Sequence, residues 1–303
     1  MKIVCRVLTG PTGSGKSAAA MRLAAERGWD IICMDSMQIY RRMDIGTAKP
    51  TREDRQAVRH HLLDIRDPEE TFSVSEYVEA AEKTIRDIHA AGREFLFVGG
   101  TGLYLQALMH PMGMGFVPAN EALRAELNEL AVRPEGKEQL HARLASLDPE
   151  TAQRLPLNDV RRTIRAIEVS EATGIPFSRQ PERTAETEFT WKAVSTAMDR
   201  DLLYRRINDR VEEMISDGLK EEVAGLLQSG VPENAQSMSA LGYKEMIPCV
   251  RGLADIRETA EAIKTGSRHY AKRQMTFLRR EPEMRYVDMS QDSAYEQIRD
   301  ILS

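Results

Sequence analysis

The stretch LTGPTGSGKSAAA at residues 8–20 decides the fold of this chain. Gly10, four further residues and the triplet Gly-Lys-Ser at 15–17 match the phosphate-binding loop G-x-x-x-x-G-K-S/T at every fixed position. In such a P-loop, successive backbone N–H groups and the start of the next helix converge on phosphate oxygens. Lys16 adds a positive charge, and the hydroxyl of Ser17 can hold Mg²⁺. The stretch therefore predicts a site for a di- or triphosphate but does not indicate which one.

The segments around the P-loop alternate between short apolar strands and helices. We expect strands at 3–9, 30–34 and 94–98, and helices at 16–27 and 74–91. The strand at 94–98 runs into a second glycine-rich turn, Gly-Gly-Thr-Gly at 99–102. This repetition is typical of a parallel sheet that carries ligand-binding groups at the carboxyl ends of its strands. The sequence therefore predicts an α/β fold with a P-loop NTPase-like parallel sheet flanked by helices.

The character of the chain changes after about residue 110. Residues 111–118 are rich in Met, Gly and Pro and suit a hinge, and 119–175 are charged and helical in pattern. A polar link then leads to a returning strand at 190–198, which helices at 201–217, 219–229 and 255–280 and a last strand at 284–289 follow. We predict a first part of the P-loop core at 1–110, an all-helical insertion domain at 111–194 and a second part of the core, with a basic C-terminal helix, at 195–303.

Bulk properties limit the class of protein. A formal net charge of −5 over 303 residues argues against a chain that coats nucleic acid everywhere, so any site for a polyanion must be local. Three scattered cysteines without metal-ligand spacing are typical of a reducing compartment. No apolar run is long enough to span a membrane. We therefore expect a soluble cytoplasmic protein, and no obligate protein partner is evident.

The usual partner motifs of an NTPase are missing. The strand at 94–98 ends in Gly-Gly-Thr rather than in an acid that could hold Mg²⁺ and position water, and no N-K-x-D motif for guanine occurs. Asp35 follows the strand next to the P-loop helix, where small-molecule kinases of this fold carry a substrate-binding acid. It is a candidate for handling an acceptor group, and the alternative is that Asp35 caps a helix.

Seven motifs occur together and in order: GPTGSGKS (10–17), DSMQIYRRMDIGTAKP (35–50), HHLLDIRDP (60–68), VGGTGLYLQAL (98–108), NDVRRTIRAIEV (158–169), LYRRINDRV (203–211) and LGYKEM (241–246). In them the chain resembles the bacterial tRNA dimethylallyltransferase family. The resemblance covers nearly the whole chain and implies a P-loop core with a helical insertion. It also implies transfer of a dimethylallyl group from dimethylallyl diphosphate to N6 of the adenosine 3′ of the anticodon (position 37) in tRNA, giving N6-isopentenyladenosine.

The resemblance assigns roles to residues at matching positions. Asp35 would accept the N6 proton as general base, and Thr101 would donate a hydrogen bond to the bridging oxygen of the leaving diphosphate. The diphosphate would be held, with Mg²⁺ on Ser17, by Gly10, Pro11, Thr12, Gly13, Ser14, Gly15, Lys16, Ser17 and Arg210. The alternatives are that Thr101 caps the helix after it and that Arg210 is an exposed helix charge.

The anticodon stem-loop of tRNA is the expected macromolecular partner. The resemblance places RNA contacts at Asp35, Ser36, Met37, Gln38, Thr101, Arg161, Arg162, Thr163, Ile164, Arg165, Gly242, Tyr243 and Lys244. Residues 264–280 add six Lys or Arg side chains without one acid. For each basic patch, the alternative is an ordinary solvated helix face.

Two other functions compete with tRNA prenylation. The first is a small-molecule kinase that holds ATP in the P-loop and uses Asp35 on an acceptor hydroxyl. The second is a non-catalytic RNA-binding module that keeps the P-loop as a switch. The long basic helices and the seven motifs argue against the kinase. The joint presence of Lys16, Ser17, Asp35 and Thr101 argues against the module.

Overall fold

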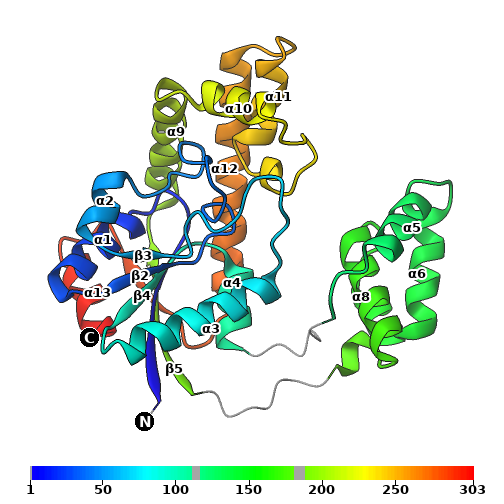
Figure 1. Ribbon diagram of the computed structural model, residues 1–303, viewed down its shortest axis with the longest axis horizontal. Helices are drawn as coiled ribbons and strands as arrows, with labels where there is room; N and C mark the ends of the chain where they lie inside the picture. Colours follow the sequence, from blue (N-terminus) through cyan, green and yellow to red (C-terminus); the bar gives the residue numbers. More distant parts are fainter. Residues whose placement is uncertain (1, 111–116, 181–187) are drawn as a thin grey trace. The chain divides into compact units, whose positions relative to one another are not determined.

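The computed structural model, which describes residues 2–110, 117–180 and 188–303, divides the chain into two units. The first combines Met1–Met109 with Thr187–Ser303, and the second is His110–Glu186 (Figure 1). Most of the hinge expected at 111–118 lies outside the described residues. Among the residues described, no helix has both the length and the apolar character needed to cross a membrane.

A six-stranded sheet with the order β3-β2-β4-β1-β5-β6 forms the centre of the first unit, and each neighbouring pair of strands is parallel. The strands are β1 (Ile3–Thr9), β2 (Asp30–Cys33), β3 (His60–His61), β4 (Phe95–Val98), β5 (Phe189–Ala197) and β6 (Arg285–Asp288). The predicted parallel sheet is thus confirmed. Leu8 of β1 pairs with Val98 of β4 and Val194 of β5, so the turns that follow β1 and β4 leave the sheet side by side.

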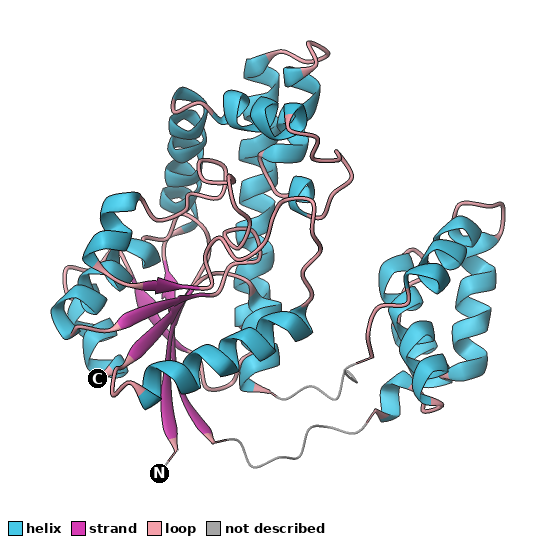
Figure 2. Cartoon of the chain, viewed as in Figure 1, coloured by secondary structure: helices cyan, strands magenta, loops and turns pink. Residues whose placement is uncertain are grey.

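Helices cover both faces of the sheet, as Figure 2 shows. Alternate residues of a strand point to opposite faces, and Leu8 accordingly packs with α1 (Lys16–Arg27) and α13 (Ala294–Leu302). Val7, its neighbour, packs in the opposite core with α3 (Val74–Ala90) and α4 (Gly102–Met109). A short helix, α2 (Arg52–Ala57), precedes β3. The sheet is therefore buried between two helical layers, which explains its nearly continuous apolar strands.

Four further helices follow β5. They are α9 (Arg200–Ser216), α10 (Leu219–Gln228), α11 (Tyr243–Val250) and α12 (Ile256–Leu278), with a short 3₁₀ turn η2 (Ser237–Ser239) between α10 and α11. The side chains of Asp199 and Asp255 accept backbone hydrogen bonds at the starts of α9 and α12 and fix where these helices begin. Leu203 and Ile207 of α9 pack on Ala271 of α12, so one face of each helix is held against the other.

The second unit is helical throughout its described residues. It contains α5 (Glu121–Ala131), α6 (Gly136–Leu147), α7 (Pro149–Arg154), α8 (Val160–Thr173) and the 3₁₀ turn η1 (Phe177–Arg179). Its core is built from Leu127, Leu144 and Ile167 of three different helices. The predicted end of the insertion at residue 194 is too late. Phe189 is already buried and pairs with Ile3, so the chain rejoins the sheet before that point.

A buried carboxylate links three segments of this helical unit. Asp148 is 1% exposed and accepts four hydrogen bonds, from the backbone and hydroxyl groups of Thr151 and Ser178, at 2.6–3.0 Å. Burial alone would raise the pKa of Asp148, but these hydrogen bonds outweigh it and lower the pKa from 3.8 to about 2. The ionised side chain therefore stabilises the connection of α6, α7 and η1.

We expect Asp148→Asn to destabilise the helical unit by roughly 2 kcal/mol at neutral pH, since each unit of pKa shift is worth about 1.4 kcal/mol. Because the folded pKa lies below the ordinary value, the stabilisation is present above about pH 4 and is lost as the pH falls toward 2. Hydrogen exchange of peptides from 117–180 in the whole protein measures the effect. Glu150→Gln, an exposed neighbour, is the matched control, and equal exchange in the two variants would contradict the role of Asp148.

Candidate functional site

The P-loop between β1 and α1 has the backbone that its glycines predict. Gly10, Gly13 and Gly15 have φ angles of 143°, 80° and 89°, a region that favours glycine. A Cβ on Gly10 would lie 2.0 Å from Oγ1 of Thr196, at the end of β5. The same Thr196 hydroxyl lies 2.6 Å from Oγ of Ser14. The loop is therefore wrapped against the sheet, and the hydroxyl of Ser14 (0% exposed) is held within the fold, which leaves its backbone as the part that can face a ligand.

Lys16 and Ser17 stand at the open side of this loop. Burial and, next, the positive charge of Arg210 lower the pKa of Lys16, the negative charge of Asp35 opposes them, and the result is a pKa of about 8. Ser17 is exposed in the first turn of α1, where backbone N–H groups are unpaired and favour anions. Within the described ranges, no three His, Cys, Asp or Glu side chains are grouped as metal ligands. The protein alone therefore offers a hydroxyl here rather than a complete metal cage.

Asp35 follows β2, and its side chain is half-buried. Its Oδ1 accepts hydrogen bonds from the backbone N–H groups of Met37 at 2.9 Å and of Gln38 at 3.3 Å. Residues 35–40 form a turn and not a helix, so the alternative of a helix cap is wrong. The turn instead fixes the direction of the carboxylate.

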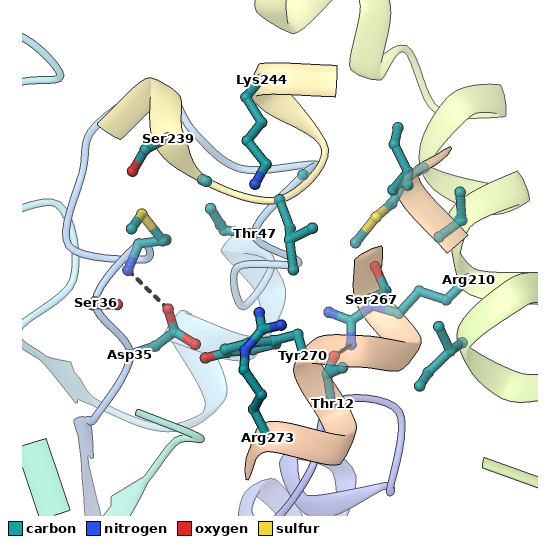
Figure 3. Close-up of a pocket in the computed structure, with 18 residues that line it drawn as sticks. Thr12, Asp35, Ser36, Thr47, Arg210, Ser239, Lys244, Ser267, Tyr270 and Arg273 are labelled. Carbon is teal, nitrogen blue, oxygen red and sulfur yellow. Dashed lines mark hydrogen bonds between the residues drawn. The ribbon is translucent and has the colours of Figure 1, made fainter. Parts of the chain in front are cut away.

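Thr101 lies opposite Asp35, in the turn that follows β4. Its Oγ1 accepts a hydrogen bond from the backbone N–H of Ser36 at 3.0 Å and lies 3.4 Å from the hydroxyl of that residue. The Thr101 hydroxyl thus joins the turns after β2 and β4. Thr101 also lies directly before α4, the position at which a helix cap was the alternative. Its hydroxyl is within hydrogen-bonding reach of Tyr270, whose pKa is raised by burial and next by the charge of Asp35. In Figure 3 the hydroxyl of Tyr270 lies beside the carboxylate of Asp35.

Arg210 approaches the P-loop from α9. One of its guanidinium nitrogens donates to Oγ1 of Thr12 at 3.3 Å. Desolvation lowers the pKa of Arg210, and the negative charges of Asp35 and Glu213 oppose this shift. The alternative of an exposed helix charge is therefore wrong, because the guanidinium is partly buried and held at the loop.

Two cavities meet at Asp35 and Arg210. The first, of about 270 Å³, includes Met37, Lys244 and Ser267 in its lining, and the second, of about 190 Å³, reaches Lys16 and Ser17. Both are lined by Thr12, Asp35, Thr47, Arg210 and Tyr270. Figure 3 shows the first cavity, with Lys244 pointing into it from the start of α11. One site therefore has two compartments with a carboxylate at their junction.

The segment at 242–244 is only partly available to a ligand. Gly242 and Tyr243 are buried, and the hydroxyl of Tyr243 donates to Oε1 of Glu222 at 2.5 Å. Lys244 is exposed at the cavity. Burial leaves the side chain of Tyr243 no surface for RNA, so the predicted contacts of Gly242 and Tyr243 could be made only by their backbone. At 35–38, Ser36 and Met37 line the first cavity, whereas the amide nitrogen of Gln38 donates to Thr47 O and Ala48 O.

The strip at 161–165 lies on α8 of the helical unit. Arg161 and Arg162 are exposed, but Thr163 and Ile164 are 2% and 4% exposed and belong to the core. Arg165 forms an ion pair with Glu168 at 2.5 Å and donates to Val117 O. The predicted RNA contacts of Thr163 and Ile164 cannot be made by their side chains, because these face the core. We restrict the strip to Arg161 and Arg162.

The contribution of α12 to the two cavities was not predicted from the sequence. Ser267 and Tyr270 line the first cavity, and Gln274 lines the second. Their spacing of three and four residues places them on one helix face, a pattern that could have indicated their role. Some of the basic side chains of 264–280 are engaged within the protein. Lys264 pairs with Glu261, and Arg268 donates to Asn208.

Comparisons with known proteins show the family of this chain. The family model described as IPP transferase matches residues 38–281. The chain is 43% identical to tRNA dimethylallyltransferase 1 of Trichlorobacter lovleyi over 296 residues, which cover 97% of this chain and 96% of that one.

Solved structures are also similar. The full-length tRNA isopentenylpyrophosphate transferase of Bacillus halodurans matches with a TM-score of 0.72 and 38% identity, covering 99% of this chain and 95% of that chain. A eukaryotic dimethylallyltransferase described as acting on tRNA matches with a TM-score of 0.80 and 25% identity, covering 98% of this chain and 77% of that chain. The resemblance seen in the seven motifs is confirmed, and the chain belongs to the IPP transferase family of tRNA-modifying prenyltransferases.

Proposed function

We propose that this protein transfers a dimethylallyl group from dimethylallyl diphosphate to N6 of the adenosine 3′ of the anticodon (position 37) in tRNA. The product is N6-isopentenyladenosine. The proposal rests on the position of Asp35, because this carboxylate lies where the two cavities meet. One cavity leads to the P-loop and suits a diphosphate ester. The other opens beside exposed Lys244 and suits a base presented by RNA.

The chemistry explains why both compartments need the carboxylate. The N6 amine is a poor nucleophile because its lone pair is delocalised into the purine ring. During transfer, N6 bonds to the allylic carbon, the bond from that carbon to the bridging oxygen breaks, and diphosphate leaves. Asp35 takes the proton from N6. Lys16 and Arg210 balance the departing negative charge, and the Thr101 hydroxyl donates to the bridging oxygen.

A magnesium ion fits the donor compartment. Mg²⁺ usually keeps several waters and binds through substrate phosphates rather than through a cage made only of protein. The exposed hydroxyl of Ser17, at the positive end of α1, suits this mode of coordination, because it offers a single protein oxygen. We propose that Ser17 and the donor phosphates hold the ion, which would neutralise charge on the leaving group.

The RNA contacts follow from the same reasoning. An adenine must leave its stack to reach an enclosed pocket, so we propose that residues 35–38 and Lys244 receive the extruded base and its neighbours. We propose that Arg161 and Arg162 of the helical unit contact the phosphate backbone. We also propose that the reaction takes place in the cytoplasm, where the three free cysteines stay reduced.

The direct test is a transfer assay. The protein is incubated with Mg²⁺, dimethylallyl diphosphate and an anticodon stem-loop that carries an unpaired adenosine next to the anticodon. Mass spectrometry should find one added five-carbon unit, and none on a control RNA with guanosine at that position. An RNA mass that stays unchanged after long incubation would refute the proposal. Phosphorylation of a small acceptor by ATP would favour a kinase instead.

In this assay, Asp35→Asn should lower turnover by about 10²–10⁴-fold, because the amide cannot accept the N6 proton. The amide oxygen can still accept the N–H groups of Met37 and Gln38, so the turn should persist. The donor dissociation constant, measured by calorimetry, should change by less than about threefold. A variant with more than a third of wild-type turnover would remove Asp35 from its role.

The low pKa of Lys16 predicts a pH dependence of donor binding. The ammonium is charged below about pH 8 and loses its charge as the pH rises through that value. Affinity for dimethylallyl diphosphate should therefore be constant near pH 7 and fall above pH 8, by at most tenfold per pH unit for one proton. Calorimetry from pH 6.5 to 9.5 measures the fall. Lys16→Met should bind weakly at every pH, and an identical pH profile in both proteins would contradict this prediction.

The double variant Arg161→Ala/Arg162→Ala should bind the stem-loop more weakly and flatten its salt dependence. Each lost phosphate contact lowers the log–log slope by about 0.9 for a duplex and 0.7 for a single strand. Donor affinity should not change. Lys83 and Arg86, two exposed cations of α3, provide a charge-matched control when both become Ala. Equal slopes in the two double variants would mean that the arginines do not meet RNA.

A further inference from the structure

The side chain of Gln274 on α12 joins the two glycine-rich turns of the site. Its Oε1 accepts a hydrogen bond from the backbone N–H of Thr12 at 2.9 Å. Its Nε2 donates to the backbone carbonyl of Gly100 at 2.8 Å. The residue is only 6% exposed, and its partners are 262 and 174 residues away along the chain. One buried amide thus spans the P-loop, the turn after β4 and the helix that lines both cavities.

The chemistry of the bridge requires a primary amide of this length. A carboxylate accepts but cannot donate to Gly100 O, an aliphatic side chain does neither, and Asn is one methylene shorter. The turn is adapted to the bridge as well. A Cβ on Gly100 would lie 2.2 Å from Nε2 of Gln274. Glycine at position 100 therefore gives the amide room to reach the carbonyl.

The bridge fixes the backbone on which two proposed ligand contacts depend. Thr12 is held from two sides, through its N–H by Gln274 and through its hydroxyl by Arg210. Thr101 directly follows Gly100 and carries the hydroxyl that we assign to the bridging oxygen. Thr9 at the end of β1 also donates directly to Gly99 O at 2.8 Å, so the two strands hold the turns together and Gln274 joins their outer parts, Thr12 and Gly100.

We infer that Gln274 is a positioning residue for the transfer step, an inference that rests on the proposed function. Its amide holds the P-loop and Thr101 at the separation that the leaving diphosphate requires. The contact to the bridging oxygen gains strength as the bond to carbon breaks, whereas the P-loop holds the terminal phosphate throughout. Misplacement by about 1 Å can cost about 10²-fold in rate, so loss of the bridge should affect turnover more than donor binding.

The first test is a double-mutant cycle on turnover. Gln274→Ala should lower kcat about 10- to 100-fold and change the donor KM by less than about threefold. In a Thr101→Ala background the same change should cost less than about threefold, because the group that the bridge positions is already absent. Leu278→Ala, which shortens a buried side chain one turn further along α12, is the matched control for packing. It should leave the kcat of the folded protein within about twofold. Equal losses from Gln274→Ala in both backgrounds would overturn the inference.

The second test is independent of the reaction. Gly100→Ala should lower the melting temperature in the wild-type background, because its Cβ meets the amide of Gln274. In a Gln274→Ala background the severe contact with the amide is gone and only Gly10 O, at 3.3 Å, stays close to the methyl group, so its cost should fall by at least half. Additive shifts would show that the amide does not fill this space, which refutes the bridge. A wild-type protein that fails the transfer assay would refute the proposed function, whereas this thermal cycle would still decide whether the bridge exists.

Discussion

No side chain fits at Gly10, Gly99 or Gly100, and the site depends on that constraint. A Cβ at these positions would lie 2.0 Å from Thr196 Oγ1, 2.0 Å from Met34 O and 2.2 Å from Gln274 Nε2. Real Cβ atoms do not approach other atoms so closely. Because the backbones can touch, the turns after β1 and β4 stay against the end of β2, and the P-loop, Thr101 and Asp35 share one edge of the sheet. A methyl group at Gly10 or Gly99 would push against Thr196 or the backbone of Met34 and separate the parts, whereas one at Gly100 would displace the amide of Gln274.

The charges at this edge are arranged for a ligand that brings negative charge. The ammonium of Lys16 loses its proton more readily than usual, because burial and the positive charge of Arg210 both lower its pKa. Desolvation acts against the charge of Arg210 as well. Asp35 favours the charge of both cations and Glu213 that of Arg210, yet the pKa values of Lys16 and Arg210 both stay below their ordinary values. A bound diphosphate would supply the missing negative charge, and its departure as a leaving group keeps that charge within reach of the same two cations.

The sequence predicted the parts of the site that local geometry defines. The P-loop needs glycine at fixed steps and Asp35 comes directly after a strand, so both could be placed from the chain alone. Burial within a motif could not be predicted in the same way. Arg161 and Ile164 belong to one motif, at 158–169, but the helix turns the first side chain outward and the second into a core. The role of Gln274 was also out of reach, because its two partners lie far away in the sequence and no local pattern marks them.

Motif residues that lie outside the cavities act through the loops that they hold. Tyr243 is buried, and burial followed by the charge of Glu222 raises its pKa, so its phenol stays protonated and donates to that carboxylate. Glu222 in turn accepts the backbone N–H groups of residues 44, 45 and 46, at 2.8–3.2 Å. A Cβ on Gly46 would lie 2.4 Å from the ring of Tyr243, so this loop closes directly onto the phenol. Gly46 and Thr47 then form part of the wall of the first cavity. The two motifs at 35–50 and 241–246 are therefore one structure, in which a tyrosine shapes the acceptor pocket without having to touch the acceptor.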